Sequence, residues 1–291
     1  MKTSALINGV TADYLNVNDR AIHYGDGLFE TILCSENKLL YWSQHYLRLQ
    51  RSAQRLKLRC PDEDVLLGDI RCLLKLNETP GSKVCSIKII ITRGSSDRGY
   101  VIPKKTNEKR IVLMSALAAD YSSLLSGELL SGELYICKNQ VSINESLAGL
   151  KHLNRLENVL ARNEWNDTAN NQFIDGLMLN ARQQVIEGSM SNVFAIKENN
   201  LYTPDLGQSG VHGIMRDMII DAAGRNNIQV SMLNLKLEDL YEMEEIFISN
   251  SLMGIRSVNK IDASLYQQQT LTKFMLSELL KTKDDHVQIV N

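Results

Sequence analysis

The sequence predicts an α+β fold with two domains and mostly antiparallel strand pairing. Hairpin signals, in which two apolar runs flank a short polar turn, occur in both halves of the chain. Segments with helical periodicity lie among them, but strands and helices do not follow the repeated βαβ order of a doubly wound sheet. The chain of 291 residues is long enough for two domains of ordinary size.

The first half of the chain contains two predicted hairpins, two helices and two further strands. The Asn-Gly pair of ALINGV predicts one tight turn, and SENK in GLFETILCSENKLLYW predicts the other. Residues 43–58 carry apolar side chains at helical spacing, with Ser43 as the expected N-cap. The remaining predicted elements are a helix over 62–77 and strands over 84–94 and 111–117.

A segment rich in Ser and Gly separates the two halves and predicts a crossover between domains. We therefore expect an N-terminal domain over 1–117, a linker over 118–130 and a C-terminal domain over 131–291. The elements expected in the second half are a strand over 134–143, a helix over 152–170, a strand pair over 173–189, a hairpin over 192–204, a helix over 213–227 ending near Gly224, and a strand, break and strand over 244–258.

Composition and charge exclude several classes of protein. Hydrophobic residues make up 44% and charged residues 23%, and the net charge of −2 provides no basic field for nucleic acid or anionic lipid. The five cysteines form no CxxC pair, which indicates reduced thiols. No signal peptide and no run of about 18 apolar residues is present. We expect a cytoplasmic protein without a membrane span.

Several common catalytic motifs are absent. GDGLFE has a glutamate where a dinucleotide-binding fingerprint needs a third glycine, and it precedes a strand rather than a helix. No phosphate-binding P-loop, no HExxH and no GxSxG sequence occurs, and the five histidines lack metal-ligand spacing. Nucleotide-fold, metal and serine-hydrolase interpretations are therefore disfavoured.

Lys151 lies at a predicted junction between a strand and a helix, in LAGLKHLNRLENVL. Most lysines are solvated surface charges, and that interpretation stays open for this one. Partial burial and nearby cations can lower the pKa of a lysine amine and make it a nucleophile. A lysine that forms a Schiff base needs such a nucleophilic, unprotonated amine.

Three further segments could complete a binding site for an anionic, heterocyclic cofactor. Glu187 ends a predicted strand and could pair with a protonated ring nitrogen, or it could face water at a strand edge. Gly213, Ile214 and Met215 begin a predicted helix whose free N–H groups favour a phosphate. Arg48 lies on an apolar helix side and could bind phosphate, or its stem could simply cover the core.

No single residue decides between these alternatives, but together they match the requirements of pyridoxal phosphate. A lysine bonds the cofactor, a carboxylate keeps its pyridine nitrogen protonated, and an arginine with a helix N-terminus holds its phosphate.

The chain also resembles the fold-type IV pyridoxal-phosphate enzymes, which include branched-chain and D-amino acid aminotransferases and 4-amino-4-deoxychorismate lyase. The resemblance extends from INGV near residue 7 to NSLMG near residue 254, through NDRAIHYGDGLFET, HYLRLQRSAQRL, ITRGSSDRGY, AGLKHLNRLENVLAR, EGSMSNVF and YTPDLGQSGVHGIMR. It implies a smaller N-terminal domain, a larger cofactor-binding domain with a barrel-like core, and a homodimer.

The resemblance also implies roles for individual residues. Lys151 is expected to form the Schiff base, Glu187 to pair with the pyridine nitrogen, and Thr31 to relay a proton. The expected cofactor-binding residues are Arg48, Ser191, Asn192, Gly213, Ile214, Met215, Asn250 and Ser251. The residues expected near the substrate are Arg98, Tyr100 and Tyr24. His152 and Arg155 receive no role.

AGLKHLNRLENVL and RGSSDRGY resemble the lyase branch of this family. That branch converts 4-amino-4-deoxychorismate to 4-aminobenzoate and pyruvate in folate biosynthesis, after an aminodeoxychorismate synthase supplies the substrate. An aminotransferase acting on D- or branched-chain amino acids is the alternative, and it would use the same lysine and glutamate. A non-catalytic binding protein on this fold is disfavoured because Lys151 and Glu187 are both present.

Overall fold

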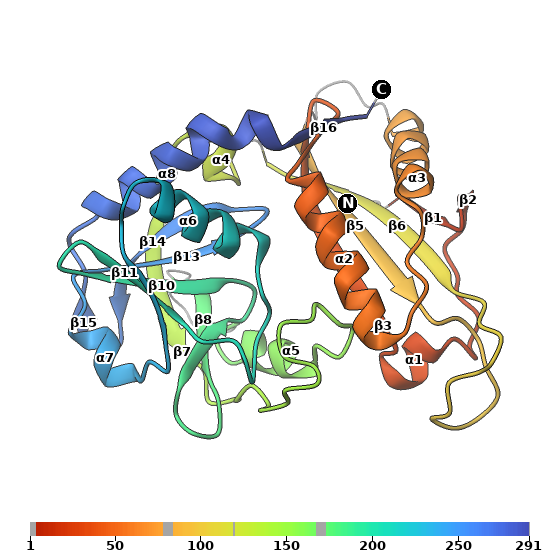
Figure 1. The fold of residues 1–291 in the computed structure, drawn as a ribbon, viewed down its shortest axis with the longest axis horizontal. Helices are drawn as coiled ribbons and strands as arrows, with labels where there is room; N and C mark the ends of the chain where they lie inside the picture. Colours follow the sequence, from red (N-terminus) through yellow and green to blue (C-terminus); the bar gives the residue numbers. More distant parts are fainter. Residues whose placement is uncertain (1–3, 78–83, 119, 167–172, 291) are drawn as a thin grey trace. The chain divides into compact units, whose positions relative to one another are not determined.

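The computed structural model describes residues 4–77, 84–118, 120–166 and 173–290, and it divides into two compact units (Figure 1). Unit 1 contains Met1–Ala119, Lys151–Asn154 and Asp284–Asn291, and unit 2 contains Asp120–Leu150 and Arg155–Lys283. The segment with Lys151 thus belongs to unit 1, although the chain enters and leaves this segment from unit 2.

Unit 1 is built on a seven-stranded sheet in the order β16-β4-β3-β5-β6-β1-β2, in which all neighbouring strands are antiparallel. Its strands are β1 (Ser4–Ile7), β2 (Val10–Thr11), β3 (Gly27–Ser35), β4 (Lys38–Leu40), β5 (Val84–Thr92), β6 (Lys109–Ala116) and β16 (Val287–Ile289). Its helices are α1 (Arg20–Tyr24), α2 (Trp42–Leu56) and α3 (Glu63–Leu76).

Both hairpins predicted for unit 1 are confirmed. Asn8 and Gly9 join β1 to β2 with φ angles of 51° and 82°, and Glu36 and Asn37 join β3 to β4 with φ angles of 51° and 61°. Two consecutive positive φ values are typical of the type I′ turn, whose twist suits a two-residue hairpin. Each turn fixes the register of its strands.

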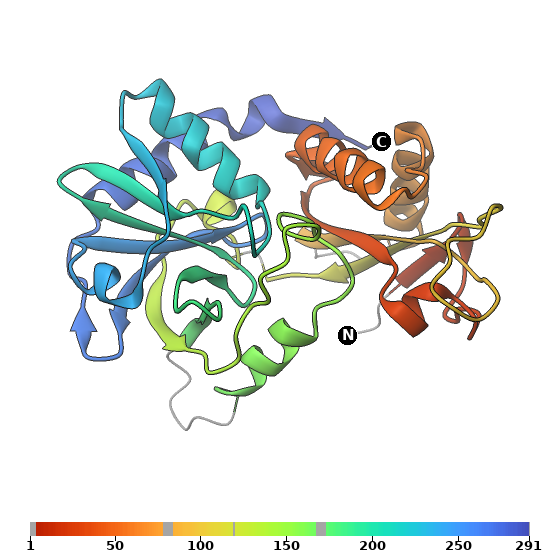
Figure 2. The same ribbon diagram turned by 60° about the horizontal axis from the view of Figure 1, so that its bottom comes forward.

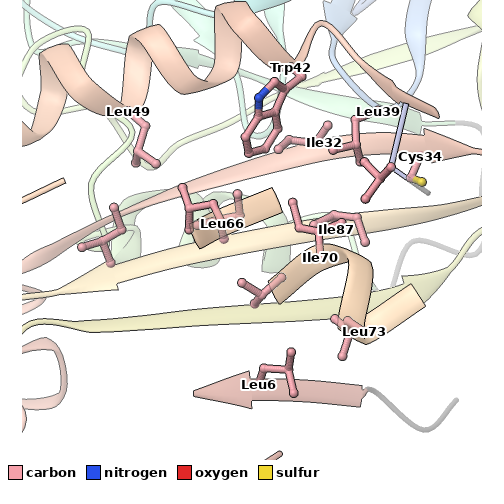
Figure 3. Close-up of a cluster of buried hydrophobic side chains, with 14 of the residues drawn as sticks. Leu6, Ile32, Cys34, Leu39, Trp42, Leu49, Leu66, Ile70, Leu73 and Ile87 are labelled. Carbon is pink, nitrogen blue, oxygen red and sulfur yellow. The ribbon is translucent and has the colours of Figure 1, made fainter. Parts of the chain in front are cut away.

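The core of unit 1 lies between the sheet and the two long helices (Figure 3). Ile32 and Ile87 on the sheet, Leu49 on α2 and Leu66 on α3 are all buried in this cluster. Burying one such side chain contributes about 1.5–3 kcal/mol to folding. The predicted Ser43 cap is wrong, because Tyr41 occupies the N-cap of α2 without a side-chain hydrogen bond and Ser43 lies inside the helix.

Unit 2 is built on a nine-stranded mixed sheet in the order β12-β11-β10-β13-β14-β7-β8-β9, with β15 paired to β14. Its strands are β7 (Ser131–Ile136), β8 (Phe173–Leu179), β9 (Val185–Gly188), β10 (Asn192–Lys197), β11 (Asn200–Pro204), β12 (Val230–Leu233), β13 (Glu245–Asn250), β14 (Gly254–Ile261) and β15 (Ser264–Leu265). Its helices are α4 (Ser123–Ser126), α5 (Leu156–Asn163), α6 (Ile214–Arg225), α7 (Leu237–Tyr241) and α8 (Thr270–Thr282), and the 3-10 turn η1 (Lys283–His286) follows α8.

The strand pair β8–β9, the hairpin β10–β11, helix α6 and the pair β13–β14 confirm the predictions for the second half. Helix α8 was not predicted. It packs beside α6 and over β13 and β14, as Figure 2 shows. Five buried side chains of α8 face that contact. The α+β class with two sheets is confirmed.

The expected helix over 152–170 is wrong in its first part. Residues 151–154 are extended, and α5 begins only at Leu156 and ends at Asn163; residues 167–170 lie outside the described part of the chain. His152 forms a β-bridge with Leu28, because the main chain of this segment finds its hydrogen-bond partners on β3. Lys151 is therefore presented from a strand-like segment.

Across the described ranges of the chain, no helix is long and apolar enough to cross a bilayer.

Candidate active site

Lys151 is held against β3 of unit 1. Its carbonyl accepts a hydrogen bond of 2.9 Å from the N–H of Phe29, and the N–H of Leu153 donates to the carbonyl of Gly27 at 3.0 Å. The Lys151 Nζ lies 4.4 Å from the centroid of the Phe29 ring, within the range of a cation–π contact. The side chain is only partly exposed, so Lys151 is not a freely solvated surface charge.

A second ammonium group lies over the same ring. The Nζ of Lys88 is 5.0 Å from the centroid of Phe29, and Lys88 is directly opposite Thr31 in the β3–β5 register. Side chains directly opposite in antiparallel strands share one face of the sheet. Phe29 and Thr31, two residues apart on β3, point to that face as well.

Sequence reasoning missed Lys88, although a signal was present. It is the single charged residue in the apolar strand run VCSIKIIIT. Alternation along β5 turns Lys88 away from the core face that holds Ile87 and Ile89, and its side chain is exposed.

Arg48 on α2 forms a two-pronged ion pair with Glu30 of β3. Its Nε donates to one carboxylate oxygen at 2.8 Å and one of its terminal nitrogens donates to the other at 2.5 Å. Burial raises the pKa of Glu30, but the charge of Arg48 and a hydrogen bond from His45 more than offset this and hold the pKa at about 2. Arg48 is thus fixed in place by an ionised, buried partner.

His45 completes this cluster from the same helix. Its Nδ1 lies 2.6 Å from a carboxylate oxygen of Glu30. Burial lowers the pKa of His45, and the charges of Arg48 and Lys151 lower it further, which outweighs the opposing effect of Glu30. Since an ionised carboxylate accepts, Nδ1 of the neutral ring donates. Nε2 is buried without a hydrogen-bond partner in the described ranges.

Arg20 organises the loop that carries the predicted substrate residues. Its guanidinium donates to the carbonyls of Gly99 at 2.9 Å and Tyr100 at 3.3 Å, and Tyr24 accepts a 3.2 Å hydrogen bond from the N–H of Gly99. The rings of Tyr24 and Tyr100 lie 5.2 Å apart. Arg98 and Tyr100 remain exposed on this loop.

Glu187 in unit 2 is buried, so the interpretation of a solvated strand-edge carboxylate is wrong. Its side chain is 4% exposed, and one carboxylate oxygen accepts a 2.8 Å hydrogen bond from the N–H of Val211. Asn192 donates from its side chain to the carbonyl of the same Val211 at 2.9 Å. The two residues thus hold the N–H and the carbonyl of one residue in the segment before α6.

The loop after Glu187 is organised by a carboxylate that the sequence reasoning did not identify. Asp175 on β8 accepts hydrogen bonds from the hydroxyls of Ser189 and Ser191, each at 2.6 Å, and from the N–H groups of Gly176, Ser189 and Met190. It is fully buried, and desolvation raises the pKa of Asp175 even though these donors oppose the shift. The Ser191 hydroxyl therefore donates its hydrogen bond to Asp175 and not to an anionic group of a ligand.

Helix α6 begins at Ile214 with Gly213 as its N-cap and without a side-chain cap. The first N–H groups of a helix have no partner within it, and the helix dipole favours an anion there. A Cβ at position 213 would come 2.0 Å from the side-chain oxygen of Asn192, so a larger residue would displace that side chain. Ile214 and Met215 supply first-turn N–H groups.

Asn250 and Ser251 lie at the end of β13. The side-chain oxygen of Asn250 accepts from the N–H groups of Leu252 and Met253 at 3.0 and 2.9 Å, and its amide donates to the carbonyl of Met190 at 3.1 Å. Asn250 thus links the turn after β13 to the loop after Glu187. Ser251 is partly exposed.

The predicted residues are divided between the two units. Unit 1 holds Tyr24, Thr31, Arg48, Arg98, Tyr100 and Lys151, and unit 2 holds Glu187, Ser191, Asn192, Gly213, Ile214, Met215, Asn250 and Ser251. Where the chain is described, no group of three or more His, Cys, Asp or Glu residues could hold a metal ion.

The sequence matches the model of one protein family over residues 27–261, described as amino-transferase class IV. It is 32% identical to an aminodeoxychorismate lyase from Vibrio harveyi over 88% of this chain and 91% of that protein. It is 29% identical to a D-alanine aminotransferase from Listeria monocytogenes over 85% of this chain and 82% of that protein.

The fold is also similar to that of a solved structure, the 4-amino-4-deoxychorismate lyase from Pseudomonas aeruginosa. The TM-score is 0.84 at 30% sequence identity, and the match covers 96% of this chain and 99% of that one. The predicted fold class is confirmed by this match, which extends over both units.

Proposed function

Because the chain belongs to the amino-transferase class IV family, we propose that it is a pyridoxal-phosphate-dependent lyase that converts 4-amino-4-deoxychorismate to 4-aminobenzoate and pyruvate. The likeness to two aminodeoxychorismate lyases supports this choice. The observation that carries it is the pair of ammonium groups, Lys151 and Lys88, that lie over Phe29. One serves the cofactor and the other serves a substrate with two carboxylates.

The described residues fit the cofactor. Lys151 offers an amine next to an aromatic ring, Glu187 offers a buried carboxylate, and α6 offers an N-terminus at Gly213 without a side-chain cap. When bound, pyridoxal phosphate supplies an electron sink that stabilises negative charge on the substrate carbon next to the amine.

Lys151 holds the cofactor and then moves a proton. When it is free, the Lys151 Nζ would take the proton from the ring carbon that bears the substrate amine. The bond between the ring carbon and the ether oxygen would break, and the enolpyruvyl group would take up a proton and become pyruvate. The ring becomes aromatic, which drives the step. Thr31 shares a sheet face with Phe29 and Lys88, and it relays a proton at that face.

Glu187 and Arg48 orient the cofactor at its two ends. Glu187 gives the ring nitrogen an anionic partner, and Val211 holds this carboxylate in place. Arg48 binds the phosphate with a guanidinium that Glu30 has already oriented, so little side-chain entropy is lost on binding. The first-turn N–H groups of α6, with Ser191, Asn192, Asn250 and Ser251 near the pocket, complete the set.

The two substrate carboxylates need two cations. Lys88 binds one from the sheet face beside Thr31, and Arg98 binds the other from the loop that Arg20 and Tyr24 hold. The Tyr100 ring of that loop packs against the Tyr24 ring of α1 at a tilted angle. Lys88→Met is expected to raise KM for 4-amino-4-deoxychorismate at least about tenfold, since a charged hydrogen bond is lost, while the cofactor spectrum stays unchanged.

We also propose that the protein is a cytoplasmic homodimer that receives its substrate from an aminodeoxychorismate synthase. Five free cysteines support the reducing compartment. An exposed apolar stripe on α5 supports self-association: Leu156, Val159 and Leu160 are 69%, 60% and 48% exposed. Sedimentation of the purified protein tests the dimer.

The alternative is a D-amino acid aminotransferase, which the likeness to the D-alanine enzyme supports. D-alanine alone would then convert the cofactor to its amine form, with a loss of visible absorbance. The lyase is expected to leave the spectrum unchanged with D-alanine and to form 4-aminobenzoate from enzymatically made 4-amino-4-deoxychorismate. Lys151→Ala is expected to abolish both turnover and the visible absorbance of the bound cofactor, and retention of either overturns its role.

A further inference from the structure

Arg155 occupies a place that is unfavourable for a cation. It is the N-cap residue of α5 and makes no capping hydrogen bond. Ser, Thr, Asp and Asn are the preferred N-caps, and the positive end of the helix dipole repels a guanidinium there. Asn154, a good capping residue, directly precedes it. Helix stability therefore does not explain the arginine.

The guanidinium of Arg155 instead bonds the residue that precedes Lys151. One terminal nitrogen donates to the carbonyl of Leu150 at 3.0 Å, and the other lies 3.5 Å from the side-chain oxygen of Asn158. Burial lowers the pKa of Arg155, while the charges of Glu187 and Glu157 raise it. Arg155 is thus a partly desolvated cation within the electrostatic reach of Glu187.

Asn158 extends this contact to the loop after Glu187. Its amide donates to the carbonyl of Ser189 at 3.0 Å, one turn of α5 beyond Arg155. Ser189 is two residues from Glu187, and its N–H and hydroxyl are fixed by Asp175. The Asn158 contact therefore reaches a segment that has little freedom to move.

The other side of Glu187 leads back to Leu150. Glu187 accepts from the N–H of Val211, and Val211 forms a parallel bridge with Gly149. The N–H of Gly149 also donates to the carbonyl of Gly210 at 2.8 Å. From Leu150 through Arg155, Asn158, the loop after Glu187 and Val211, the contacts form a closed ring within unit 2.

We propose that Arg155 is a positioning residue for the reaction. It fixes the main chain immediately before Lys151 to the segment that carries Glu187. The inference rests on the proposed function, in that Lys151 bonds the cofactor and Glu187 faces its ring nitrogen. It gives a role to a residue of KHLNRLE that the sequence left without one.

The test uses cofactor-loaded protein without substrate. The visible absorbance of the bound cofactor is titrated against pH, and the rate of cofactor loss is followed after dilution. The variants are Arg155→Met, Arg155→Lys and Asn158→Ala. Arg182→Met is the matched control, because it removes the same charge from an exposed turn where the Arg182 side chain donates to Gln208.

Each variant has its own expected result. Arg155→Met raises the titration midpoint by about one pH unit, because removing a nearby cation eases protonation of the nitrogen that joins Lys151 to the cofactor. It also speeds cofactor loss about tenfold. Arg155→Lys keeps the midpoint within a few tenths of a unit, and Asn158→Ala keeps the midpoint but speeds cofactor loss about threefold.

The proposal is overturned if Arg155→Met titrates like Arg182→Met and releases cofactor at the wild-type rate. Should Arg155→Met fail to fold in a thermal unfolding scan, Asn158→Ala decides, and wild-type release by that variant overturns the proposal. Failure of the proposed function is recognised separately. Wild-type protein would then bind cofactor but form no 4-aminobenzoate, and the substrate-free comparison would still stand.

Discussion

Glu30 in unit 1 and Asp175 in unit 2 are both buried carboxylates, and their pKa values are shifted in opposite directions. Glu30 faces the guanidinium of Arg48 and the ring of His45, and its pKa falls to about 2. Asp175 accepts a larger number of hydrogen bonds, but all come from uncharged hydroxyl and N–H groups, and its pKa is raised.

The difference shows that neutral donors do not offset the desolvation of a buried carboxylate here, whereas a cation does. It also matches the proposed roles of the two regions. The Glu30 pair orients a cation for an anionic phosphate, while Asp175 shapes a loop whose carbonyls and hydroxyls must stay fixed. The following predictions test this contrast, beginning with the largest expected effect.

Arg48→Met is expected to lower the free energy of unfolding by about 3–5 kcal/mol, because it leaves Glu30 buried without its cation. Urea denaturation of the cofactor-free protein at pH 7 measures this. The double variant Glu30→Gln/Arg48→Met is the control and should recover most of the loss. A loss below about 1 kcal/mol in the single variant would show that the ion pair contributes little.

The pH dependence of the Glu30 contribution follows from its lowered pKa. The folded-state pKa of about 2 lies below the ordinary glutamate value of 4.5, so the stabilisation is present above pH 4.5 and is lost as pH falls toward 2. The difference in unfolding free energy between wild type and Glu30→Gln should shrink by about 2 kcal/mol between pH 6 and pH 3. A constant difference over this range would argue against an ionised Glu30.

Asp175→Asn is expected to lower the free energy of unfolding by about 1–3 kcal/mol at pH 7. The amide nitrogen of the asparagine then faces hydrogen-bond donors that need an acceptor. Its pH dependence has the opposite sign. The raised folded-state pKa makes the ionised form unfavourable, so the advantage of wild type over Asp175→Asn grows as pH falls through that pKa. The difference in unfolding free energy from wild type is measured against pH for Glu30→Gln and for Asp175→Asn. The two slopes are expected to have opposite signs, and equal slopes would contradict this contrast.

Ser191→Ala is expected to have the smallest effect, about 1 kcal/mol, because Asp175 retains its other donors. Thermal unfolding is sensitive enough to detect it. An equal loss from Ser189→Ala is expected, since both hydroxyls lie 2.6 Å from the carboxylate. A loss above about 3 kcal/mol from either serine would mean that the donors act as a cooperative network.

Local patterns predicted most of the fold. Asn8–Gly9 and Glu36–Asn37 confirm that turn residues with positive φ identify a hairpin from a few letters. The failures occurred where tertiary contacts decide the conformation. Residues 151–154 lie along β3 instead of joining α5, because β3 supplies their hydrogen-bond partners from more than 100 positions away in the sequence. The N-cap of α2 is Tyr41, which has a left-handed backbone conformation, and Ser43 lies inside the helix.

The candidate site was less predictable than the fold. Lys151, Glu187 and the start of α6 can be identified because their segments have recognisable local patterns. Glu30 and Asp175 interrupt buried strands, which is a usable signal, but their partners come from other elements and no spacing reveals them. Lys88 could not be placed beside Thr31 until the register between β3 and β5 was known.

The most direct test of the proposed lyase is a count of turnovers without a keto acid. Wild-type protein with bound cofactor is mixed with an excess of 4-amino-4-deoxychorismate, and 4-aminobenzoate, pyruvate and the visible cofactor absorbance are followed together. The lyase is expected to form both products in equal amounts over many turnovers per site, with the absorbance restored at the end. A reaction that stops after one turnover per site, with the cofactor left in its amine form, would contradict it and indicate an aminotransferase.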